Sequence, residues 1–197
     1  MRSIIRESIE TITPALFVLL VVHQLVGHYE VHQSSMLPRL TEGDRVLVHK
    51  AAFMEIDAAR AARWLPWVRA DAGDEWHPFG EPGRGDIIVF HWPRDPSQDF
   101  VKRVIGLPGD TVEIRSGTVY VNGAALDEPY VQRPLADSHR AITVQPERYY
   151  VLGDNRAASD DSRDWGTVPA DLIVGKVQVS FWPLEHFSFL TTVATAP

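Results

Sequence analysis

A recurring Gly-Asp dipeptide divides the chain, and four of its copies stand where a short apolar run begins or ends. These four copies are Gly43-Asp44, Gly85-Asp86, Gly109-Asp110 and Gly153-Asp154. Glycine accepts the positive φ angles of tight turns, and an Asp carboxylate bonds nearby backbone N–H groups, so the dipeptide is typical of turns. Short runs of branched and aromatic residues between turn signals favour strands. The chain is therefore predicted to be rich in β-structure.

Two of the predicted strands are joined by a turn of only two residues. This turn, Ser116-Gly117, lies between runs in which apolar and polar residues alternate, a pattern that predicts a β-hairpin. The predicted strands are Asp44–His49, Asp86–Trp92, Phe100–Leu107, Thr111–Arg115, Thr118–Val121, Arg148–Leu152 and Leu172–Trp182.

One segment, Met54 to Gly83, departs from this pattern. Its first part is rich in alanine and arginine and favours a helix, which Pro66 would interrupt. It also contains Trp64, Trp67 and Trp76. Two interpretations stay open: a surface excursion folded on its own aromatic residues, or a flap that touches a membrane, because tryptophan favours the bilayer interface.

The strongest apolar stretch lies near the N-terminus. Residues Ile12 to Val26 form an apolar run of 15 residues, which is short of the roughly 20 that a helix needs to cross hydrocarbon. Extension back to Ile4 and forward to Val31 supplies the missing length. We therefore predict one transmembrane helix here, with an amphipathic or buried helix and a cleaved signal peptide as the alternatives.

The anchor prediction divides the chain into two parts. Residues 1–31 are expected to form a cytoplasmic stub and membrane anchor, and residues 32–197 a catalytic β domain. Arg2 and Arg6 favour a cytoplasmic N-terminus, which would place the larger domain outside the cell.

Composition excludes several kinds of chemistry. The net charge is −7 and the chain has no cysteine, which argues against nucleic-acid binding and excludes disulfides, thiolate zinc sites and cysteine nucleophiles. Neither a Gly-x-Ser-x-Gly elbow nor a His-Glu-x-x-His zinc pair occurs. His28 and His32 are spaced to share a helix face, but no third ligand is in sight, so no metal site is predicted.

A serine with an unusual base is the remaining possibility. Ser34 and Ser35 follow the apolar stretch directly, and either is a candidate nucleophile. Arginine does not lose its proton in proteins, so a base must come from the three lysines, Lys50, Lys102 and Lys176.

Burial decides among the lysines, because an apolar environment disfavours the ammonium and lowers its pKa. Lys102 shares a strand face with Phe100 and Val104 and is the best placed for such burial. Lys50 ends a strand and is expected to face solvent. Lys176 also lies in an apolar run and is the rival candidate.

Four motifs follow one another along the chain. Taken in order, they resemble the conserved boxes of the bacterial type I signal peptidases, the leader peptidase family of Ser–Lys serine proteases. They are Ser35-Met36-Leu37-Pro38 with Leu40; Gly43 to Lys50; Arg84 to Phe90 with Val101 to Asp110; and Gly153 to Arg156 with Ser159, Asp161-Ser162-Arg163 and Trp165-Gly166.

The resemblance implies catalytic roles for three residues. Ser35 matches the nucleophile that attacks the scissile carbonyl. Lys102 matches the general base, which later protonates the leaving amine. Ser159 matches the serine that hydrogen-bonds and orients this lysine.

The resemblance also implies roles for residues around the dyad. Asp161 and Arg163 match a structural ion pair, Asp154 is expected to meet Arg103, and Met36 matches a residue that lines the substrate pocket. One position departs from the family. Gln33 stands where a small hydroxyl residue helps build the oxyanion hole, so the Gln33 side chain is an uncertain donor beside the Ser35 backbone N–H.

For the whole protein, the resemblance implies a mainly β, antiparallel catalytic domain with one N-terminal transmembrane helix in the plasma membrane. Its implied substrates are exported preproteins with N-terminal signal peptides, cut after small residues such as alanine at the first and third positions before the bond. Membrane lipid is the other implied partner, and no metal or organic cofactor is implied.

Two other functions fit parts of the pattern. A self-cleaving SOS-repressor-type protease shares the Ser–Lys core, but it would be soluble and would carry a DNA-binding segment. A membrane-anchored β-rich binding module would need no chemistry. The joint presence of Ser35, Lys102 and Ser159 in family register argues against such a module.

Overall fold

The computed structural model describes residue 10 and residues 12–17, 23–53, 56–57, 75–76, 80–132 and 134–192. Within these residues the chain forms one eight-stranded sheet, one four-stranded sheet and a separate pair of strands. Neighbouring strands pair antiparallel throughout this part of the chain. The prediction of a mainly β, antiparallel fold is therefore confirmed.

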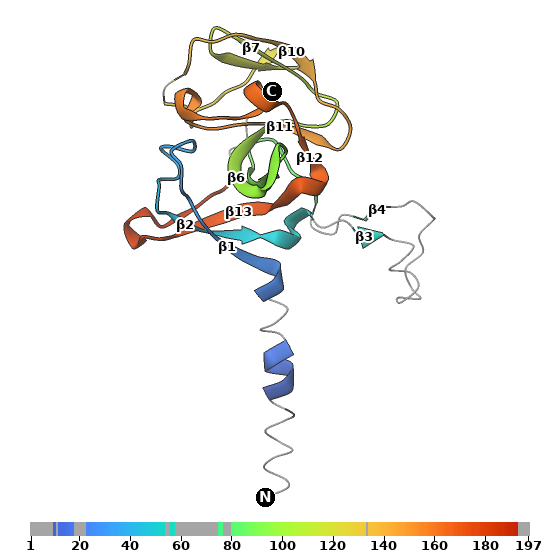
Figure 1. The fold of residues 1–197 in the computed structure, drawn as a ribbon, viewed down its shortest axis with the longest axis vertical. Helices are drawn as coiled ribbons and strands as arrows, with labels where there is room; N and C mark the ends of the chain where they lie inside the picture. Colours follow the sequence, from blue (N-terminus) through green and yellow to red (C-terminus); the bar gives the residue numbers. More distant parts are fainter. Residues whose placement is uncertain are drawn as a thin grey trace, which may run out of the picture.

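The large sheet holds the strands that frame the site, in the order β1-β2-β13-β5-β6-β11-β12, with β14 paired to β13 (Figure 1). β1 is thus an edge strand. The strands are β1 (Val26–Glu30), β2 (Arg45–His49), β5 (Ile87–Trp92), β6 (Asp95–Gly106), β11 (Arg148–Leu152), β12 (Val168–Pro169), β13 (Ile173–Trp182) and β14 (Ser188–Phe189).

The small sheet has the order β10-β7-β8-β9 and contains the predicted hairpin. Arg115 pairs with Thr118, and the turn residues Ser116 and Gly117 have φ angles of 47° and 83°, as a two-residue hairpin turn requires. The strands are β7 (Thr111–Arg115), β8 (Thr118–Val121), β9 (Ala124–Ala125) and β10 (His139–Thr143), and the separate pair is β3 (Ile56–Asp57) with β4 (Glu75–Trp76).

Short helical segments connect the strands. The four-residue α-helix α3 (Ser162–Trp165) follows the loop after β11. The 3₁₀ segments are η1 (Lys50–Phe53), η2 (Arg156–Ala158), η3 (Ala170–Leu172) and η4 (Leu184–His186).

Three of these four Gly-Asp dipeptides form the same turn. In each, the Asp N–H donates to the carbonyl three residues earlier, and one Asp carboxylate oxygen accepts the N–H of that same residue. Gly43, Gly85 and Gly109 all have φ angles between 87° and 89°. Gly153 does not have a positive φ angle, so the requirement for glycine at this position has another cause.

The centre of the large sheet is covered on both faces. Ile87 and Val89 of β5 pack into one cluster of buried apolar side chains, while Ile88 and Phe90, on the opposite face of β5, pack into another. β6 runs beside β5 and carries Ile105 into a third cluster, shared with the small sheet. A side chain in the middle of β6 is therefore enclosed by apolar neighbours.

The N-terminal region differs in part from the prediction. Residues Val26–Glu30 were assigned to the anchor, but they form β1 and pair with β2. His28 therefore lies in a strand, where its ring contacts Phe181 at 6.1 Å, and not on a helix face with His32. A segment of five residues with mixed apolar and polar side chains suits an edge strand as well as a helix end.

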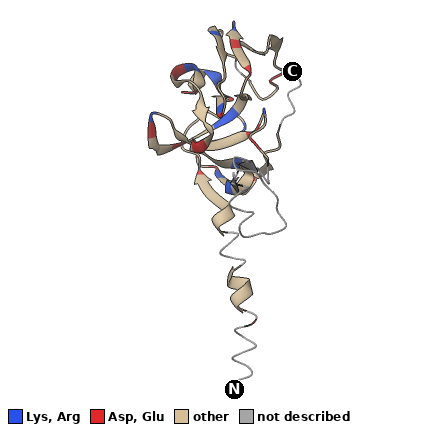
Figure 2. Ribbon diagram, turned by 90° about the vertical axis from the view of Figure 1, so that its right-hand side faces the viewer, with Lys and Arg blue, Asp and Glu red and all other residues tan. Residues whose placement is uncertain are grey.

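Residues 12–17 and 23–25 are helical and precede the sheet (Figure 1). Figure 2 shows them in tan, because they contain no Lys, Arg, Asp or Glu. In the part of the chain that the structure describes, no helix is both long enough and apolar enough to cross a membrane. Most of the Met54–Gly83 excursion lies outside the described residues.

Candidate active site

Ser35 lies in the turn that follows β1, and two backbone segments hold this turn in place. The turn begins at Val31, whose N–H donates to the Asp44 carbonyl at 2.9 Å. The Asn155 N–H donates to the Ser35 carbonyl at 2.9 Å, and the Asn155 side-chain amide donates to the Ser34 carbonyl at 3.1 Å. The loop after β11 thereby positions the backbone of both serines.

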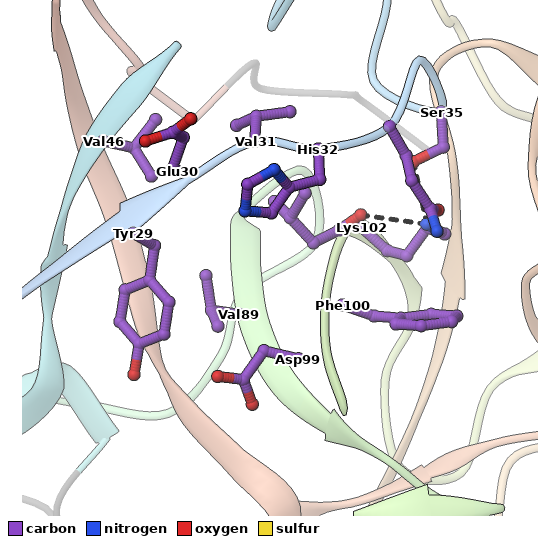
Figure 3. A pocket seen from close by; sticks show the side chains of 12 residues that line it. Tyr29, Glu30, Val31, His32, Ser35, Val46, Val89, Asp99, Phe100 and Lys102 are labelled. Atoms are coloured by element: carbon purple, nitrogen blue, oxygen red, sulfur yellow. Dashed lines mark hydrogen bonds between the residues drawn. The ribbon is translucent and has the colours of Figure 1, made fainter. Parts of the chain in front are cut away.

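Lys102 occupies the middle of β6, opposite Ile88 of β5. Its Nζ lies 2.9 Å from Ser35 Oγ and donates to the Val101 carbonyl at 3.1 Å. Both side chains are enclosed, because Lys102 is 1% and Ser35 2% exposed. The structure thus brings together two residues that are 67 positions apart in the sequence (Figure 3).

Burial sets the charge state of this lysine. Desolvation lowers the pKa of Lys102 from 10.5 to about 8, although the carboxylates of Asp161, Asp160 and Asp154 oppose that change. A buried ammonium loses its hydration, and three carboxylates recover only part of the loss. The amine is therefore neutral in a substantial fraction of molecules at mildly alkaline pH.

The other two lysines lie away from Ser35. Lys176 Nζ lies 2.6 Å from the Asp86 carboxylate and donates to the Thr192 hydroxyl at 3.0 Å. Lys50 is exposed at the start of η1, as expected. Only Lys102, of the three, contacts Ser35.

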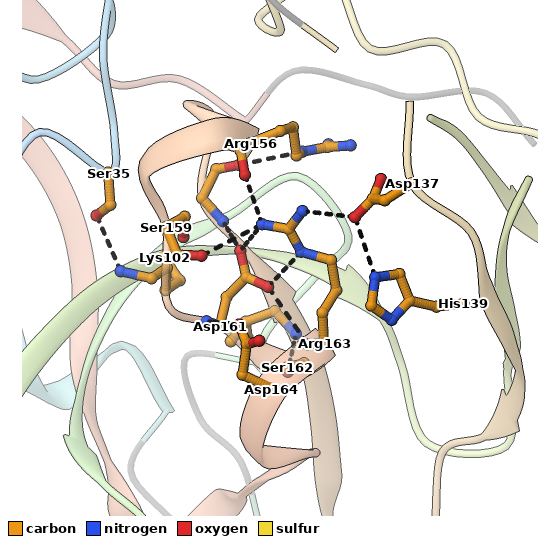
Figure 4. A network of polar contacts seen from close by, with 12 residues as sticks. Ser35, Lys102, Asp137, His139, Arg156, Ser159, Asp161, Ser162, Arg163 and Asp164 are labelled. Carbon is orange, nitrogen blue, oxygen red and sulfur yellow. Dashed lines mark hydrogen bonds and ion pairs between the residues drawn. The ribbon is translucent and has the colours of Figure 1, made fainter. Parts of the chain in front are cut away.

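Arg163 joins the loop after β11 to the small-sheet side of the molecule. It donates to the Asp161 carboxylate from Nε at 2.8 Å and to the Asp137 carboxylate at 3.0 Å. It also donates to the carbonyls of Arg156 at 2.8 Å and Ser159 at 3.3 Å. Figure 4 shows the guanidinium at the centre of these contacts. The expected Asp161–Arg163 pair is present and buried.

Asp161 has a second function in the loop. Its carboxylate accepts the Gly153 N–H at 3.1 Å and caps α3 in a capping box with Asp164. These contacts satisfy N–H groups that the first turn of a helix leaves unpaired. The carboxylate that does most to raise the pKa of Lys102 against burial is consequently held by both ends of its own loop.

A second buried ion pair lies beneath the loop. Arg103 donates to Asp154 from Nε at 2.8 Å and from a terminal nitrogen at 2.6 Å, and both side chains are 1% exposed. The guanidinium also donates to the Gly85 carbonyl at 2.8 Å and stacks over the Tyr130 ring at 4.0 Å. The expected contact between Asp154 and Arg103 is therefore present, in bidentate form.

Ser159 differs from the expectation. Its hydroxyl is buried but makes no hydrogen bond within the described residues, so the expected bond to Lys102 is not formed. Its position is nevertheless tight. A Cβ added to Gly153 would lie 2.3 Å from Ser159 Oγ and 2.6 Å from the Ser35 carbonyl oxygen. This close approach is the reason for glycine at position 153.

Gln33 and Met36 lie in different environments. Gln33 is exposed at the rim of the pocket beside Ser35, and its amide makes no hydrogen bond in the described part of the chain. Met36 was expected to line that pocket, but it is fully buried among the core side chains beneath β2. The turn that presents Ser35 outward sends the next side chain inward.

Several supporting residues are absent from the prediction. Asn155, Asp137 and Glu128 hold the loop through Ser35, Arg163 and Arg156 respectively. Asn155 belongs to one of the four motifs, so its position in the motif was a usable signal. Asp137 and Glu128 lie in an irregular segment without periodicity, and nothing local to them indicates a partner.

A small pocket opens beside Ser35 and Lys102. Its volume is about 100 Å³. Its apolar floor consists of Val31, Val46, Val89 and Val101. A cavity of this size accepts a small side chain more readily than a large one.

The sequence matches the family described as "Signal peptidase, peptidase S26" over residues 5–182. It is 36% identical to a probable signal peptidase I-2 of Synechocystis sp. over 167 residues, covering 82% of this chain and 65% of that protein. It is 35% identical to a signal peptidase I of Leptolyngbya laminosa over 192 residues, covering 93% of this chain and 83% of that protein.

A solved structure is also similar. The crystal structure of a signal peptidase I from Enterococcus faecalis is 38% identical, with a TM-score of 0.45, covering 49% of this chain and 97% of that one. Because the family match spans nearly the whole sequence and relatives align at about 35% identity, the chain belongs to peptidase S26, the signal peptidase family of serine endopeptidases.

Proposed function

We propose that this chain removes signal peptides from exported preproteins, with Ser35 as the nucleophile and Lys102 as the general base. The 2.9 Å contact between Lys102 Nζ and Ser35 Oγ carries this proposal, together with the burial that lowers the pKa of the lysine to about 8. A base must be unprotonated and within hydrogen-bond reach of the proton that it takes. Lys102 lies within this reach, and its lowered pKa makes the unprotonated amine available at mildly alkaline pH.

In the first step, the neutral Lys102 amine takes the proton of the Ser35 hydroxyl while Oγ attacks the scissile carbonyl. The Lys102 ammonium then returns this proton to the leaving amine as the C–N bond breaks. A water molecule hydrolyses the acyl-enzyme in the second step, with Lys102 again accepting the proton and Ser35 recovering it.

The negative charge on the carbonyl oxygen needs donors in both steps. The Ser35 N–H makes no hydrogen bond in the described residues and is available for this purpose. Gln33, exposed at the pocket rim, is a candidate second donor through its side-chain amide.

The pocket supports cleavage after small residues. Its volume of about 100 Å³ and its four-valine floor suit alanine at the third position before the cut, whereas a large side chain would be overpacked. We therefore propose Ala-x-Ala-like sites as substrates.

The surrounding ion pairs support the dyad without touching the substrate. Asp161 with Arg163, and Asp154 with Arg103, hold the loop that carries the carbonyl contacts to Ser35. Ser159 is proposed to orient Lys102 once a substrate excludes water from the site.

We propose further that the residues before β1 form a single membrane anchor, with the catalytic domain on the extracytoplasmic side. Residues 12–17 support an anchor because they are helical and uncharged, and their apolar side chains Ile12, Leu16 and Phe17 are between 52% and 66% exposed. A preprotein that emerges at the same membrane would then reach Ser35 directly.

The test uses the full-length protein in detergent micelles and a preprotein with an Ala-x-Ala site. Ser35→Ala and Lys102→Ala should each abolish cleavage of this preprotein, whereas Ser34→Ala should retain it. In the wild type, kcat/KM should rise about tenfold for each pH unit below about 8 and level off above it. Cleavage by Lys102→Ala at the wild-type rate would overturn the mechanism.

A further inference from the structure

The pocket beside Ser35 has a polar end that the proposed mechanism does not use. Figure 3 shows Tyr29 and Asp99 at the side of the pocket away from Ser35. Both side chains line the pocket, and burial together with the Asp99 charge raises the pKa of Tyr29. The hydroxyl of Tyr29 thus stays protonated beside a carboxylate.

The Asp99 carboxylate has unused hydrogen-bonding capacity. One oxygen, Oδ1, lies 2.7 Å from His91 Nδ1, while Oδ2 makes no hydrogen bond or ion pair in the described residues. The side chain is 37% exposed. The pocket's other carboxylate, Glu30, already lies 3.6 Å from the Arg45 guanidinium. Asp99 is therefore the carboxylate that is open to a cation from a bound peptide.

The strand register indicates which substrate residue would reach Asp99. Asp99 pairs with His91 and Val101 with Val89, so Asp99 and Val101 point to the same face, two residues apart. This inference rests on the proposed function, in which a small residue at the third position before the cut lies over Val101. Side chains of an extended peptide return to one face every second residue, about 6.6 Å further on. The fifth residue before the cut then lies beside Asp99.

We propose that Asp99 is a specificity-determining residue that favours substrates with lysine or arginine at the fifth position before the cut. The long side chain would lie along the Tyr29 ring with its cationic head at Asp99 Oδ2. A partly exposed ion pair of this kind favours the basic peptide by about fivefold in kcat/KM.

The experiment uses two peptides that differ only at the fifth position before the cut, where one carries lysine and the other glutamine. Both peptides compete for cleavage by the full-length protein in micelles. The wild-type preference for the lysine peptide should be about fivefold. Asp99→Asn should reduce the preference to about one. Asp95→Asn removes the same charge from the same strand outside the pocket and should keep it.

Two results would overturn the specificity role: a wild-type preference near one, or a fivefold preference that survives in Asp99→Asn. The same preference for lysine at the fourth position would contradict the register argument, because that side chain faces away from β6. A different result would contradict the proposed function. If Ser35→Ala cleaves the glutamine peptide as fast as the wild type, another site does the cutting, whatever the preference.

Discussion

The difference in free energy of unfolding between Lys102→Met and the wild type should favour the variant more at neutral pH than at alkaline pH. Methionine fills the same apolar site without a charge. The pKa of Lys102 falls from 10.5 to about 8 on folding. At about 1.36 kcal/mol for each pH unit, burying the ammonium costs about 3 kcal/mol of folding free energy.

The sign follows from proton binding. Below pH 8 both the folded and unfolded wild type carry the ammonium, so the full cost is present. Between pH 8 and 10.5 the unfolded chain binds a proton that the folded chain does not, so wild-type stability rises with pH. The advantage of Lys102→Met should therefore shrink by about 3 kcal/mol across this window. The loss of the Ser35 hydrogen-bond partner costs about 1–3 kcal/mol at every pH and does not change the slope.

The assay is urea unfolding of the full chain in micelles at pH 7.5, 8.5, 9.5 and 10.5, followed by tryptophan fluorescence. Lys50→Met is the matched control, because Lys50 is exposed and its removal should give a difference that does not vary with pH. A flat difference for Lys102→Met as well would refute the conclusion that Lys102 is desolvated in the folded protein.

Three further substitutions probe the surroundings of the dyad. Asp154→Ala should lower the free energy of unfolding by about 3–5 kcal/mol by leaving the Arg103 guanidinium buried alone; the double variant Asp154→Leu, Arg103→Met should recover most of this loss in urea titrations, and no recovery would contradict the ion-pair explanation. Gly153→Ala should reduce cleavage about a hundredfold, because its Cβ would lie 2.6 Å from the Ser35 carbonyl oxygen; wild-type turnover would refute the close-approach argument. Arg163→Lys should lower the free energy of unfolding by about 2 kcal/mol, because an ammonium cannot span the carboxylates and carbonyls that the guanidinium joins. An unchanged urea midpoint would contradict that role.

Local features of the sequence were sufficient for the seven strands that were predicted and for the hairpin turn. The hairpin around Ser116-Gly117 appears in the predicted register, because a two-residue turn with two positive φ angles allows only one pairing. Three Gly-Asp turns share one hydrogen-bond pattern. Val26–Glu30 was not predicted as a strand, because five residues of mixed polarity are compatible with either a strand or the end of a helix. The strand His139–Thr143 was not predicted either.

The sequence by itself determined that Lys102 lies in an apolar strand, because the residues on both faces of this strand, Phe100 and Val104 on one and Val101 and Ile105 on the other, are apolar. Only the tertiary structure decided what Lys102 meets there. The loop after β11 grips the carbonyls of Ser34 and Ser35 through Asn155, and this grip turns the Ser35 hydroxyl toward Nζ and sends Met36 into the core. Local sequence sets the face of a strand through its two-residue period, whereas contacts across 67 positions depend on how separate strands pair.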